Sequence, residues 1–442
     1  MAFAYFPHTE DDVRQMLDRI GVGSLEDLYS DVPQDVIYRQ EYDLPDAMSE
    51  HEVRQYFEEL AEQNTSLFCL CGLGAYDHYS PAVIPHIISR SEFLTAYTPY
   101  QPEVSQGTLR YIFEYQSMIT ELTGMDCTNA SMYDGATAAA EAVMMAVAST
   151  KKKTRVLLSE GLLPQVVEVI RTYAKFKGVE LGFVPCHEGA TSYGALLTEL
   201  AAGDVAGVLV PGINKYGIIE DFTGFADAVH AQKGLFMIYS DPSSLAVIKT
   251  PGEWGADIVC GDSQSLGIPL GYGGPYVGFL ACSKDLVRKL PGRIVGATRD
   301  VDGKRAYVLT LQAREQHIRR EKATSNICSN QSLMALYVTV YMSLMGPEGL
   351  RKVNELSYGG GHYLHDRLLE TGLFEKVFDK PFLKEFTLRT LVPAQQIQNA
   401  LQMIGVFGAV EVEDGLVNFC VTEKVSKENL DAVVGYLKEL QS

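Results

Sequence analysis

The sequence lacks the features that mark membrane-spanning, secreted or nucleic-acid-binding proteins. None of its apolar runs approaches the ~20 residues of a membrane-spanning helix. Residues 1–6 have neither a basic start nor a long apolar core, so they do not read as a signal peptide. Basic residues are few, 37 against 56 acidic ones, and the net charge of −19 repels phosphate backbones and anionic lipids. We therefore expect a cytoplasmic protein that binds neither nucleic acid nor membrane.

The sequence also lacks a metal-binding pattern of cysteine and histidine. Eight cysteines are present, but no CxxC pair and no Cys/His array has the spacing of a zinc site. The two closest, Cys69 and Cys71, stand in an apolar run that favours buried free thiols. Free thiols suit a reducing compartment. No metal site is expected.

The chain is long enough, at 442 residues and 46% hydrophobic, for more than one domain. Residues 1–90 read as an N-terminal helical arm with loops, because the helix starts at Thr9 and Ser49 are well capped but carry little apolar surface. In residues 91–325 short apolar strands alternate with amphipathic helices. This pattern predicts a large α/β domain with a mostly parallel sheet covered on both faces. Residues 326–442 predict a smaller α+β domain.

The elements of these domains follow from the hydrophobic pattern and its breaks. The expected strands of the large domain are 155–159, 179–185, 205–211, 235–241, 257–262 and 276–282. The expected helices are 109–123, 134–148, 163–175, 192–202 and 222–232. A helix to Leu344, a break at Gly346 and Pro347, and a helix over 349–370 open the last domain.

Ligands of open α/β sheets bind beyond the carboxyl ends of the strands, and the first stretch that could lie there is the start of the helix at residue 134. Free amides at Gly135 and the Thr137 hydroxyl could cradle a phosphate. A carboxylate at Asp134 would compete with that phosphate. A plain Asp cap on a closely packed helix is the alternative.

The second stretch is the end of the strand 235–241, which places Asp241 at the sheet edge. In enzymes that use pyridoxal phosphate (PLP), an Asp at this position keeps the pyridine nitrogen protonated and makes the ring an electron sink. The alternative is an Asp that caps a turn before Pro242.

The third stretch is a strand followed by a glycine-rich loop, over residues 256–275. A PLP enzyme of this fold carries its Schiff-base lysine here, but no lysine lies between Lys249 and Lys284. Without that amine the covalent chemistry of the cofactor cannot occur on this chain. The alternative is a glycine-rich turn that never formed such a site.

Two irregular segments carry aromatic and polar side chains of the kind that line binding clefts. They are the loops 72–81 and 97–106, and an ordinary surface connection is the alternative for both. Their candidate residues are Tyr76, His78, Tyr97, Thr98, Tyr100, Gln101 and Gln106.

A run of basic residues interrupts the acidic chain near residue 314. It could bind a carboxylate, a phosphate or an acidic protein surface. The alternative is a solvated link in which Glu315 and Glu321 pair with the cations. The candidate residues are Arg314, His317, Arg319, Arg320 and Lys322.

Four stretches resemble one known family closely. They are YTPYQPEVSQG (97–107), YDGATA (133–138), LGIPLGYGGPYVGF (266–279) and REQHIRREKATSNIC (314–328). The chain resembles the alpha-type subunits, also called subunit 1, of the glycine cleavage system P-protein, glycine dehydrogenase (decarboxylating). The resemblance implies the fold of PLP-dependent transferases of fold type I, the aminotransferase-like fold.

The resemblance also implies a partner and a reaction. A beta-type subunit of similar fold would carry the PLP lysine and form a heterodimer with this chain. The complex would decarboxylate glycine, release CO2 and transfer the aminomethyl group to the lipoyl group of H-protein. Docking of an acidic H-protein would need a local basic patch such as Arg314 to Lys322.

Within that family the missing lysine has an approximate position. Alignment on Ile268 and Pro269 places Gln264, beside Ser265, where lysine-bearing subunits have theirs. Asp134, Gly135, Thr137, Asp241, Gln264 and Ser265 would then form a vestigial cofactor pocket. The loops 72–81 and 97–106 would approach the partner's PLP.

Two alternatives remain open at the level of sequence. The chain could be a non-catalytic scaffold that only stabilises the beta subunit. It could also be a stand-alone enzyme that binds PLP on some other lysine.

Overall fold

The computed structural model describes residues 5, 7–95, 97–150, 152–311, 316–323 and 325–439, with His317 described in its backbone alone. Contacts divide the chain into two units, Met1–Thr65 and Ser66–Ser442. Over the described residues, no helix has both the length and the apolar character needed to cross a membrane.

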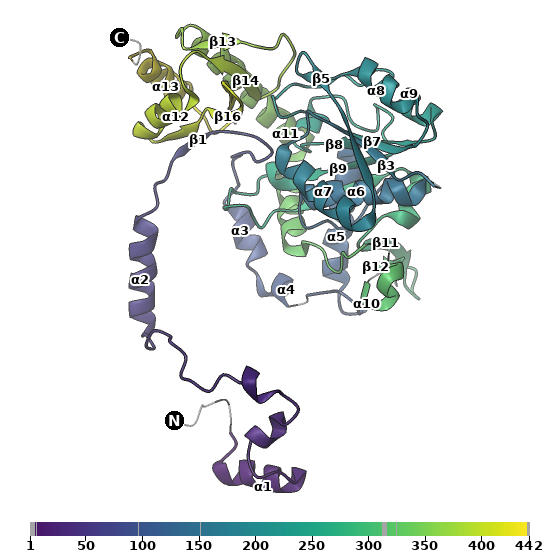
Figure 1. The fold of residues 1–442 in the computed structure, drawn as a ribbon, viewed down its shortest axis with the longest axis vertical. Coiled ribbons are helices and arrows are strands. Elements are labelled where there is room, and N and C mark those ends of the chain that lie inside the picture. Colours follow the sequence, from purple (N-terminus) through teal and green to yellow (C-terminus); the bar gives the residue numbers. More distant parts are fainter. Residues whose placement is uncertain are drawn as a thin grey trace. The chain divides into compact units, whose positions relative to one another are not determined.

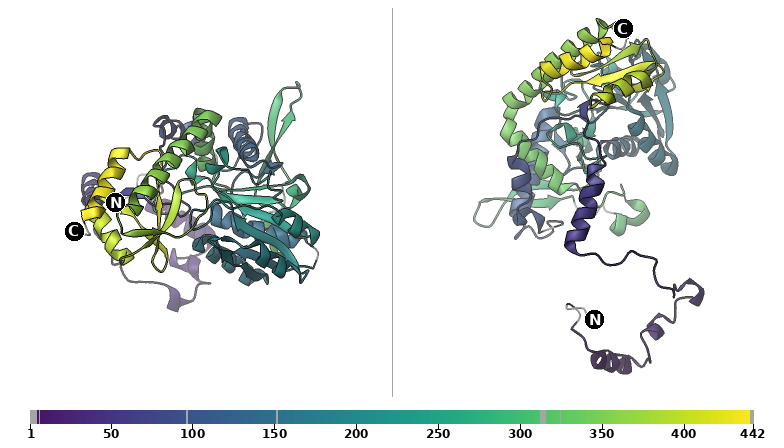
Figure 2. Two further views of the ribbon diagram at one scale, coloured as in Figure 1. Left: turned by 90° about the horizontal axis from the view of Figure 1, so that it is seen from above. Right: turned by 90° about the vertical axis from the view of Figure 1, so that its left-hand side faces the viewer.

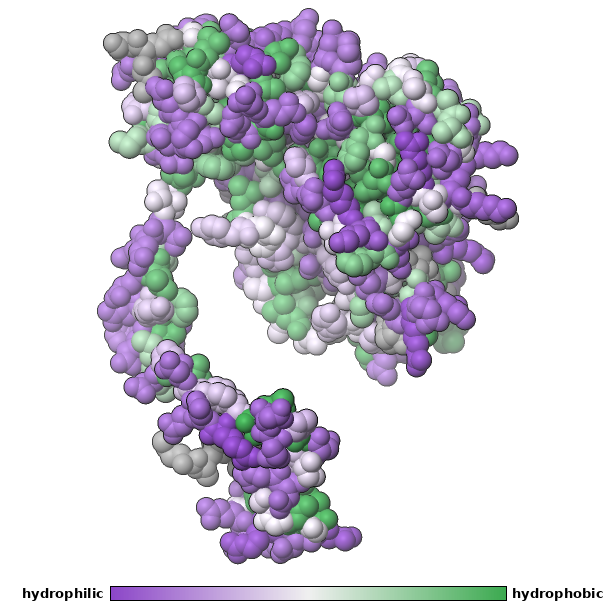
Figure 3. Space-filling model, viewed as in Figure 1, coloured by the Kyte–Doolittle hydropathy of each residue, from purple (hydrophilic) through white to green (hydrophobic). Residues whose placement is uncertain are grey.

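The first unit is helical and has no core of its own. Its helices begin with the expected caps, because the side chains of Thr9 and Ser49 each accept a hydrogen bond from the third residue of the helix. None of its described residues is buried, and Phe57 is 62% exposed. Apolar residues are visible on the surface of this unit (Figure 3). The elements are α1 (Glu10–Ile20), α2 (Glu50–Glu62) and the short 3-10 helices η1 (Glu26–Tyr29) and η2 (Gln34–Val36).

The second unit is organised around a seven-stranded sheet with the strand order β2-β10-β9-β8-β7-β3-β4 (Figure 1). The five strands from β9 to β4 in this order run parallel, and β10 is antiparallel to both of its neighbours. The strands are β2 (Cys127–Thr128), β3 (Arg155–Ser159), β4 (Glu180–Val184), β7 (Val205–Pro211), β8 (Leu235–Tyr239), β9 (Ile258–Asp262) and β10 (Gly278–Cys282).

Helices cover both faces of this sheet, and each face has its own apolar core. Strand β8 shows the alternation, because Phe236 and Ile238 belong to one core and Met237 belongs to the other. The helices of the Met237 core are α6 (Gly135–Ser149) and α7 (Pro164–Lys177). Those of the other core are α5 (Gln106–Thr123), α8 (Tyr193–Leu200), α9 (Phe225–Ala231) and the first part of α11 (Ser332–Leu369). A sheet buried on both faces is what near-continuous apolar strands predict.

The C-terminal region forms a third core around a four-stranded antiparallel sheet of order β13-β14-β17-β16. Helix α11 enters this region after a kink at Gly346, where the backbone is not helical, at the expected Gly-Pro break. The elements are β13 (Phe374–Lys376), β14 (Glu385–Thr390), α12 (Ala394–Met403), β16 (Val410–Glu413), β17 (Leu416–Cys420) and α13 (Lys427–Glu439).

The segment after Thr65 joins the second unit, whereas the sequence pattern placed residues up to 90 with the arm. The reason is strand β1 (Phe68–Leu70), which pairs in parallel with β15 (Val406–Gly408) far along the chain. The boundary expected at residue 325 stays a prediction.

Most expected elements of the large domain are present, and the ranges 155–159 and 205–211 match β3 and β7 residue for residue. The hairpin of β11 (Ile294–Arg299) and β12 (Arg305–Thr310), which projects from the body of the unit (Figure 2), was not anticipated. The remaining short elements are α3 (Val83–Ile88), α4 (Ser91–Leu94), β5 (Cys186–His187), β6 (Ala190–Thr191), η3 (Ser244–Ala246), η4 (Ser263–Ser265), η5 (Lys284–Lys289), α10 (Gln316–Arg319) and η6 (Arg320–Lys322).

Candidate functional site

The carboxyl ends of β8 and β9 bring Asp241 and Ser265 together. Asp241 follows β8, and Ser265 ends the 3-10 turn after β9. The Ser265 hydroxyl donates a hydrogen bond to Asp241 Oδ1, and the Ser243 amide donates to the same oxygen at 3.2 Å. The Asp241 side chain is only 7% exposed. Asp241 therefore caps its own turn and is at the same time a buried carboxylate at the sheet edge.

A lysine from the C-terminal region pairs with this carboxylate. Lys384, which directly precedes β14, places its ammonium 2.8 Å from Asp241 Oδ2. The lysine is 1% exposed, and its Nζ lies 3.9 Å from the centre of the Tyr76 ring. Burial favours a raised pKa for Asp241, but the Lys384 ammonium and the Ser265 hydroxyl outweigh it and lower the pKa. The contacts with Lys384 and Ser265 thus favour the carboxylate form of Asp241.

Two side chains of the loop 72–81, Tyr76 and His78, are buried beside this ion pair. Tyr76 is 5% exposed and donates from its hydroxyl to Glu385 Oε2 at 2.9 Å. His78 is 2% exposed, with Nε2 3.0 Å from Lys384 Nζ. Neither side chain is accessible to a partner subunit. This corrects the expectation that Tyr76 and His78 face one, since the chain itself supplies the buried groups that they bind.

His78 continues the network to the end of the small sheet. Its Nδ1 lies 2.6 Å from Glu423 Oε2, three residues after β17. Burial lowers the pKa of His78, and the neighbouring Lys384 ammonium lowers it further. Because the ammonium can only donate, neutral His78 accepts at Nε2 and donates from Nδ1 to Glu423. Asp241, Lys384, His78 and Glu423 thus form one continuous buried chain, here called the Lys384 network.

Gln264 stands next to this network and is fully engaged by the backbone. Its side-chain oxygen accepts from the Tyr76 amide at 2.7 Å, and its side-chain nitrogen donates to the carbonyls of Tyr76 and Ile268 at 2.8 and 2.7 Å. Gln264 is 1% exposed. At the position where the sequence alignment places a missing lysine, the structure has an amide that fixes the loop 72–81.

The start of α6 carries two carboxylates where an anion would need free amides. Asp134 accepts from the Thr137 amide at 2.7 Å, as an ordinary N-cap. Asp262 accepts from the Gly135 amide at 2.9 Å. Burial and the neighbouring Asp134 raise the pKa of Asp262 to about 7. A Cβ at Gly135 would lie 2.6 Å from Tyr239 Oη, so this helix start also has no room for a larger residue.

The loop 97–106 differs from the loop 72–81 because its tyrosines face outward. Tyr97 is 83% exposed and Tyr100 is 62% exposed. The Arg293 guanidinium lies over the Tyr100 ring. Gln101 is exposed and Thr98 is half-buried. At the end of the loop, Gln106 binds both the amide and the carbonyl of Tyr307 and so secures the β11–β12 hairpin.

The basic segment near residue 314 is described only in part. Arg314 and the His317 side chain lie outside the described residues. Arg319, Arg320 and Lys322 are exposed. Arg320 lines a cavity of about 330 Å³ together with Glu141, whose pKa is raised to about 7 by burial.

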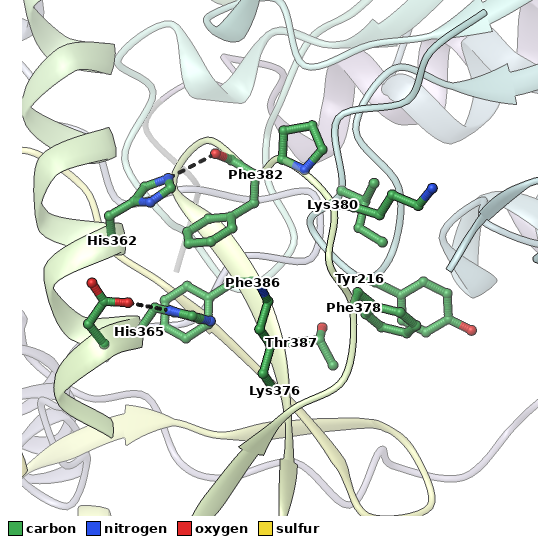
Figure 4. A pocket seen from close by; sticks show the side chains of 12 residues that line it. Tyr216, His362, His365, Lys376, Phe378, Lys380, Phe382, Phe386 and Thr387 are labelled. Carbon is green, nitrogen blue, oxygen red and sulfur yellow. Dashed lines mark hydrogen bonds and ion pairs between the residues drawn. The ribbon is translucent and has the colours of Figure 1, made fainter. Parts of the chain in front are cut away.

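Another cavity, of about 260 Å³, lies where the C-terminal region meets the large domain (Figure 4). Its wall is an aromatic stack in which the His362 ring lies parallel to that of Phe382, with centres 3.9 Å apart. His362 Nε2 is 3.1 Å from the Phe382 carbonyl, which holds the ring in place. Tyr216 from the large domain closes the opposite side. No residue of the Lys384 network lines this cavity.

Sequence reasoning missed three buried charged residues of the candidate site: Lys384, Glu385 and Glu423. Glu385 accepts from the Leu73 amide and the Tyr76 hydroxyl, and burial raises its pKa. The one available signal was the charged pair at 384 and 385 inside the otherwise apolar run 382–386. A charged pair in a strand that packs a core needs buried partners, but the sequence does not say where those partners are.

Both the sequence and the fold of this chain match those of known proteins. The model of the glycine cleavage system P-protein family matches residues 3–437. A probable glycine dehydrogenase (decarboxylating) subunit 1 of Moorella thermoacetica is 48% identical over 441 residues, which cover 98% of this chain and 99% of that protein. The similarly named protein of Anoxybacillus flavithermus is 45% identical over 443 residues and 98% of each chain.

Solved structures confirm the aminotransferase-like fold of PLP-dependent enzymes. A crystal structure of glycine decarboxylase (P-protein) of the glycine cleavage system, in inhibitor-bound form, has a TM-score of 0.91 at 44% identity and covers 100% of both chains. More distant likenesses show the fold alone. They include a cysteine desulfurase of Thermococcus onnurineus (TM-score 0.62, 12% identity, 90% of this chain and 99% of that one) and an aspartate aminotransferase of Thermus thermophilus (0.58, 16%, 84% and 98%).

Proposed function

The chain belongs to the glycine cleavage system P-protein family, and from this premise we propose that it is the lysine-free subunit of a two-subunit glycine dehydrogenase (decarboxylating). A beta-type subunit of similar fold would hold PLP on its own lysine. Together the two subunits would decarboxylate glycine and pass the aminomethyl group to the lipoyl group of H-protein. The observation that carries this proposal is that the residues of the expected cofactor site bind one another, with Asp241 paired to Lys384 and Gln264 bound to the backbone of the loop 72–81.

The groups that would hold PLP here do not fit it. No lysine stands between Lys249 and Lys284, and Gln264 is committed to the backbone of the loop 72–81. The carboxylate that would face the pyridine nitrogen is paired with Lys384. Carboxylates at 134 and 262 accept from the helix-start amides, where a phosphate would be repelled. PLP, which supplies an electron sink when bound, is therefore assigned to the partner.

The partner surface is proposed from the groups that this chain leaves exposed. Tyr97, Tyr100 and Gln101 point away from their own core and suit the rim of a neighbouring site. The first unit buries none of its described residues, and its exposed apolar side chains need a covering surface. Both features support a chain that works within a complex.

The basic segment supports the last part of the proposal. Its described cations, Arg319, Arg320 and Lys322, are exposed on a chain whose net charge is −19. A local positive patch permits an acidic H-protein to dock where the overall charge would repel it.

Reconstitution tests the proposal. This chain, the lysine-bearing subunit and lipoylated H-protein are mixed with glycine and labelled bicarbonate, and incorporation of label into glycine is measured. Exchange is expected only when both subunits are present. Exchange by this chain alone, supplied with PLP and H-protein, would overturn the proposal in favour of a stand-alone enzyme.

Alanine variants of Tyr97, Tyr100 and Gln101 separate this function from that of a pure scaffold. If the loop reaches the partner's site, exchange should fall roughly tenfold or more, because misplaced reacting groups cost rate steeply. The amount of complex, measured by size-exclusion chromatography, should not change. Unchanged exchange in all three variants would favour the scaffold.

A further inference from the structure

We infer that Lys384 is the internal occupant of the cofactor pocket: its side chain takes the place that the pyridine ring of PLP has in enzymes of this fold, and it closes the pocket permanently. This inference rests on the proposed function, which assigns the cofactor to the partner. It concerns a residue of the small domain that belongs to none of the family motifs quoted above.

The first argument is the match of charge and hydrogen bonding at Asp241. In PLP enzymes the carboxylate at this strand end accepts from a protonated pyridine nitrogen. Here the Lys384 ammonium donates to Asp241 Oδ2 at 2.8 Å. A cation with a donor hydrogen thus meets the carboxylate, so the buried charge of Asp241 is compensated without a ligand.

The second argument is that the ammonium has a partner for each of its three N–H groups. One is Asp241 Oδ2, the second is His78 Nε2 at 3.0 Å, and the third is the face of the Tyr76 ring at 3.9 Å. Lys384 is 1% exposed, and its displacement would leave the buried Asp241 carboxylate without its partner. The Tyr76 ring is itself buried, 5% exposed, and covers the Lys384 ammonium.

The third argument is connectivity. The network joins three segments that are far apart in sequence: the end of β8, the start of β14 and the loop 72–81. Gln264 adds a second tie by binding the Tyr76 backbone from the turn after β9. One buried cation therefore holds the small domain and the loop against the large domain, a connection that a bound cofactor would otherwise make.

Chemical labelling tests the occupancy directly. The reconstituted complex is treated with PLP and borohydride, which reduces the imine formed by any accessible lysine to a stable amine, and the labelled lysines of this chain are mapped by mass spectrometry. Exposed lysines such as Lys233 should be labelled, whereas Lys384 should be labelled only after unfolding in urea. Labelling of Lys384 in the native complex would overturn the inference.

A double-mutant cycle tests the pairing independently of the labelling. Lys384→Met and Asp241→Asn should each lower the thermal midpoint by several degrees, because each leaves a buried charge without its partner. The double variant, which removes both charges, should recover most of that loss. Losses that add up in the double variant would contradict the inference. If the Lys384→Met protein does not fold, Asp241→Asn and the double variant still decide, since the double variant should then be the more stable of the two.

A matched control lies beside the same loop. Lys424 pairs with Asp77 at 2.6 Å, but its side chain is 39% exposed. Lys424→Met should leave the midpoint nearly unchanged because exposed pairs contribute little. The outcomes also separate the two proposals. Additive losses of the thermal midpoint in a complex that still catalyses exchange would refute only the inference that Lys384 occupies the pocket. Absence of exchange in the wild-type complex would refute the proposed function.

Discussion

The two loops that carry most of the aromatic residues near the candidate site differ in burial, since only the loop 72–81, whose Tyr79 is 59% exposed, buries any of these residues. In the loop 72–81, Tyr76 and His78 are buried against charged groups of the same chain. In the loop 97–106, Tyr97 and Tyr100 are mostly exposed. Sequence composition alone does not distinguish the loops, since both mix tyrosine, proline and polar residues. What separates them is whether the rest of the chain supplies buried partners.

The contrast has a functional meaning within a two-subunit enzyme. A polar aromatic residue that is satisfied inside its own chain stabilises that chain, and replacing it should cost folding free energy. One that is left exposed costs little to replace in the isolated chain, so its effect should show only in the complex. The free energy of unfolding of single variants, measured in the isolated chain, therefore tests whether the two loops differ in this way.

Placing a lysine at Gln264, the position proposed for the missing one, should have the largest effect. Gln264→Lys removes three hydrogen bonds of a residue that is 1% exposed and places an unpaired ammonium in a buried position. We expect a loss of about 3–5 kcal/mol, the cost typical of an uncompensated buried charge, and no gain of PLP binding. Urea unfolding and the visible absorbance of added PLP measure the two effects.

Gln264→Met is the matched control for that variant, because it removes the hydrogen bonds but adds no charge. It should be destabilised less than the lysine variant. A stable Gln264→Lys protein that binds PLP would mean that the cofactor pocket is open. The buried side chains of the loop 72–81 would then not fill that pocket.

A methyl group at the start of α6 should have the next largest effect. In Gly135→Ala the new Cβ would lie 2.6 Å from Tyr239 Oη and 2.7 Å from the Asp262 amide. Overpacking of this kind costs about 1–3 kcal/mol. Gly107→Ala, in α5 and with no atom within 4 Å of its Cβ, should be neutral or slightly stabilising because alanine favours the helix. Equal losses of stability in the two variants would contradict the close packing at Gly135, at the start of α6.

These outcomes depend on features that sequence reasoning reached to different degrees. The ranges of β3 and β7 were predictable because apolar runs between breaks define strands locally. Asp241 and Ser265 were predictable as neighbours because strand ends meet at one edge of a sheet. Lys384 was not, since its partner is 143 positions away and no local pattern connects them. The inward orientation of Tyr76 and His78 was missed for the same reason.

A pH-dependent prediction concerns Glu141, a buried acid in α6. Its pKa is raised to about 7 by burial, against about 4.3 in an unfolded chain. The folded state therefore binds this proton more tightly, and the stabilisation is complete below about pH 4 and lost as the pH rises through 7. Glu141→Gln cannot ionise, so relative to wild type it should gain about 2–3 kcal/mol between pH 5 and pH 8. Urea unfolding at the two pH values measures this, and a constant difference would contradict the raised pKa.

The smallest expected effect separates two glutamines of the same loop. Gln106 binds the amide and the carbonyl of Tyr307, whereas Gln101 is exposed. Gln106→Ala should cost about 1–2 kcal/mol, since it leaves backbone groups of the β11–β12 hairpin without their partner. Gln101→Ala should change the free energy of unfolding by less than about 0.5 kcal/mol, even if it lowers exchange in the complex. If Gln101→Ala destabilises the isolated chain as much as Gln106→Ala, the outer part of the loop stabilises the chain itself. The exposed residues of this loop would then not be reserved for contacts with the partner subunit.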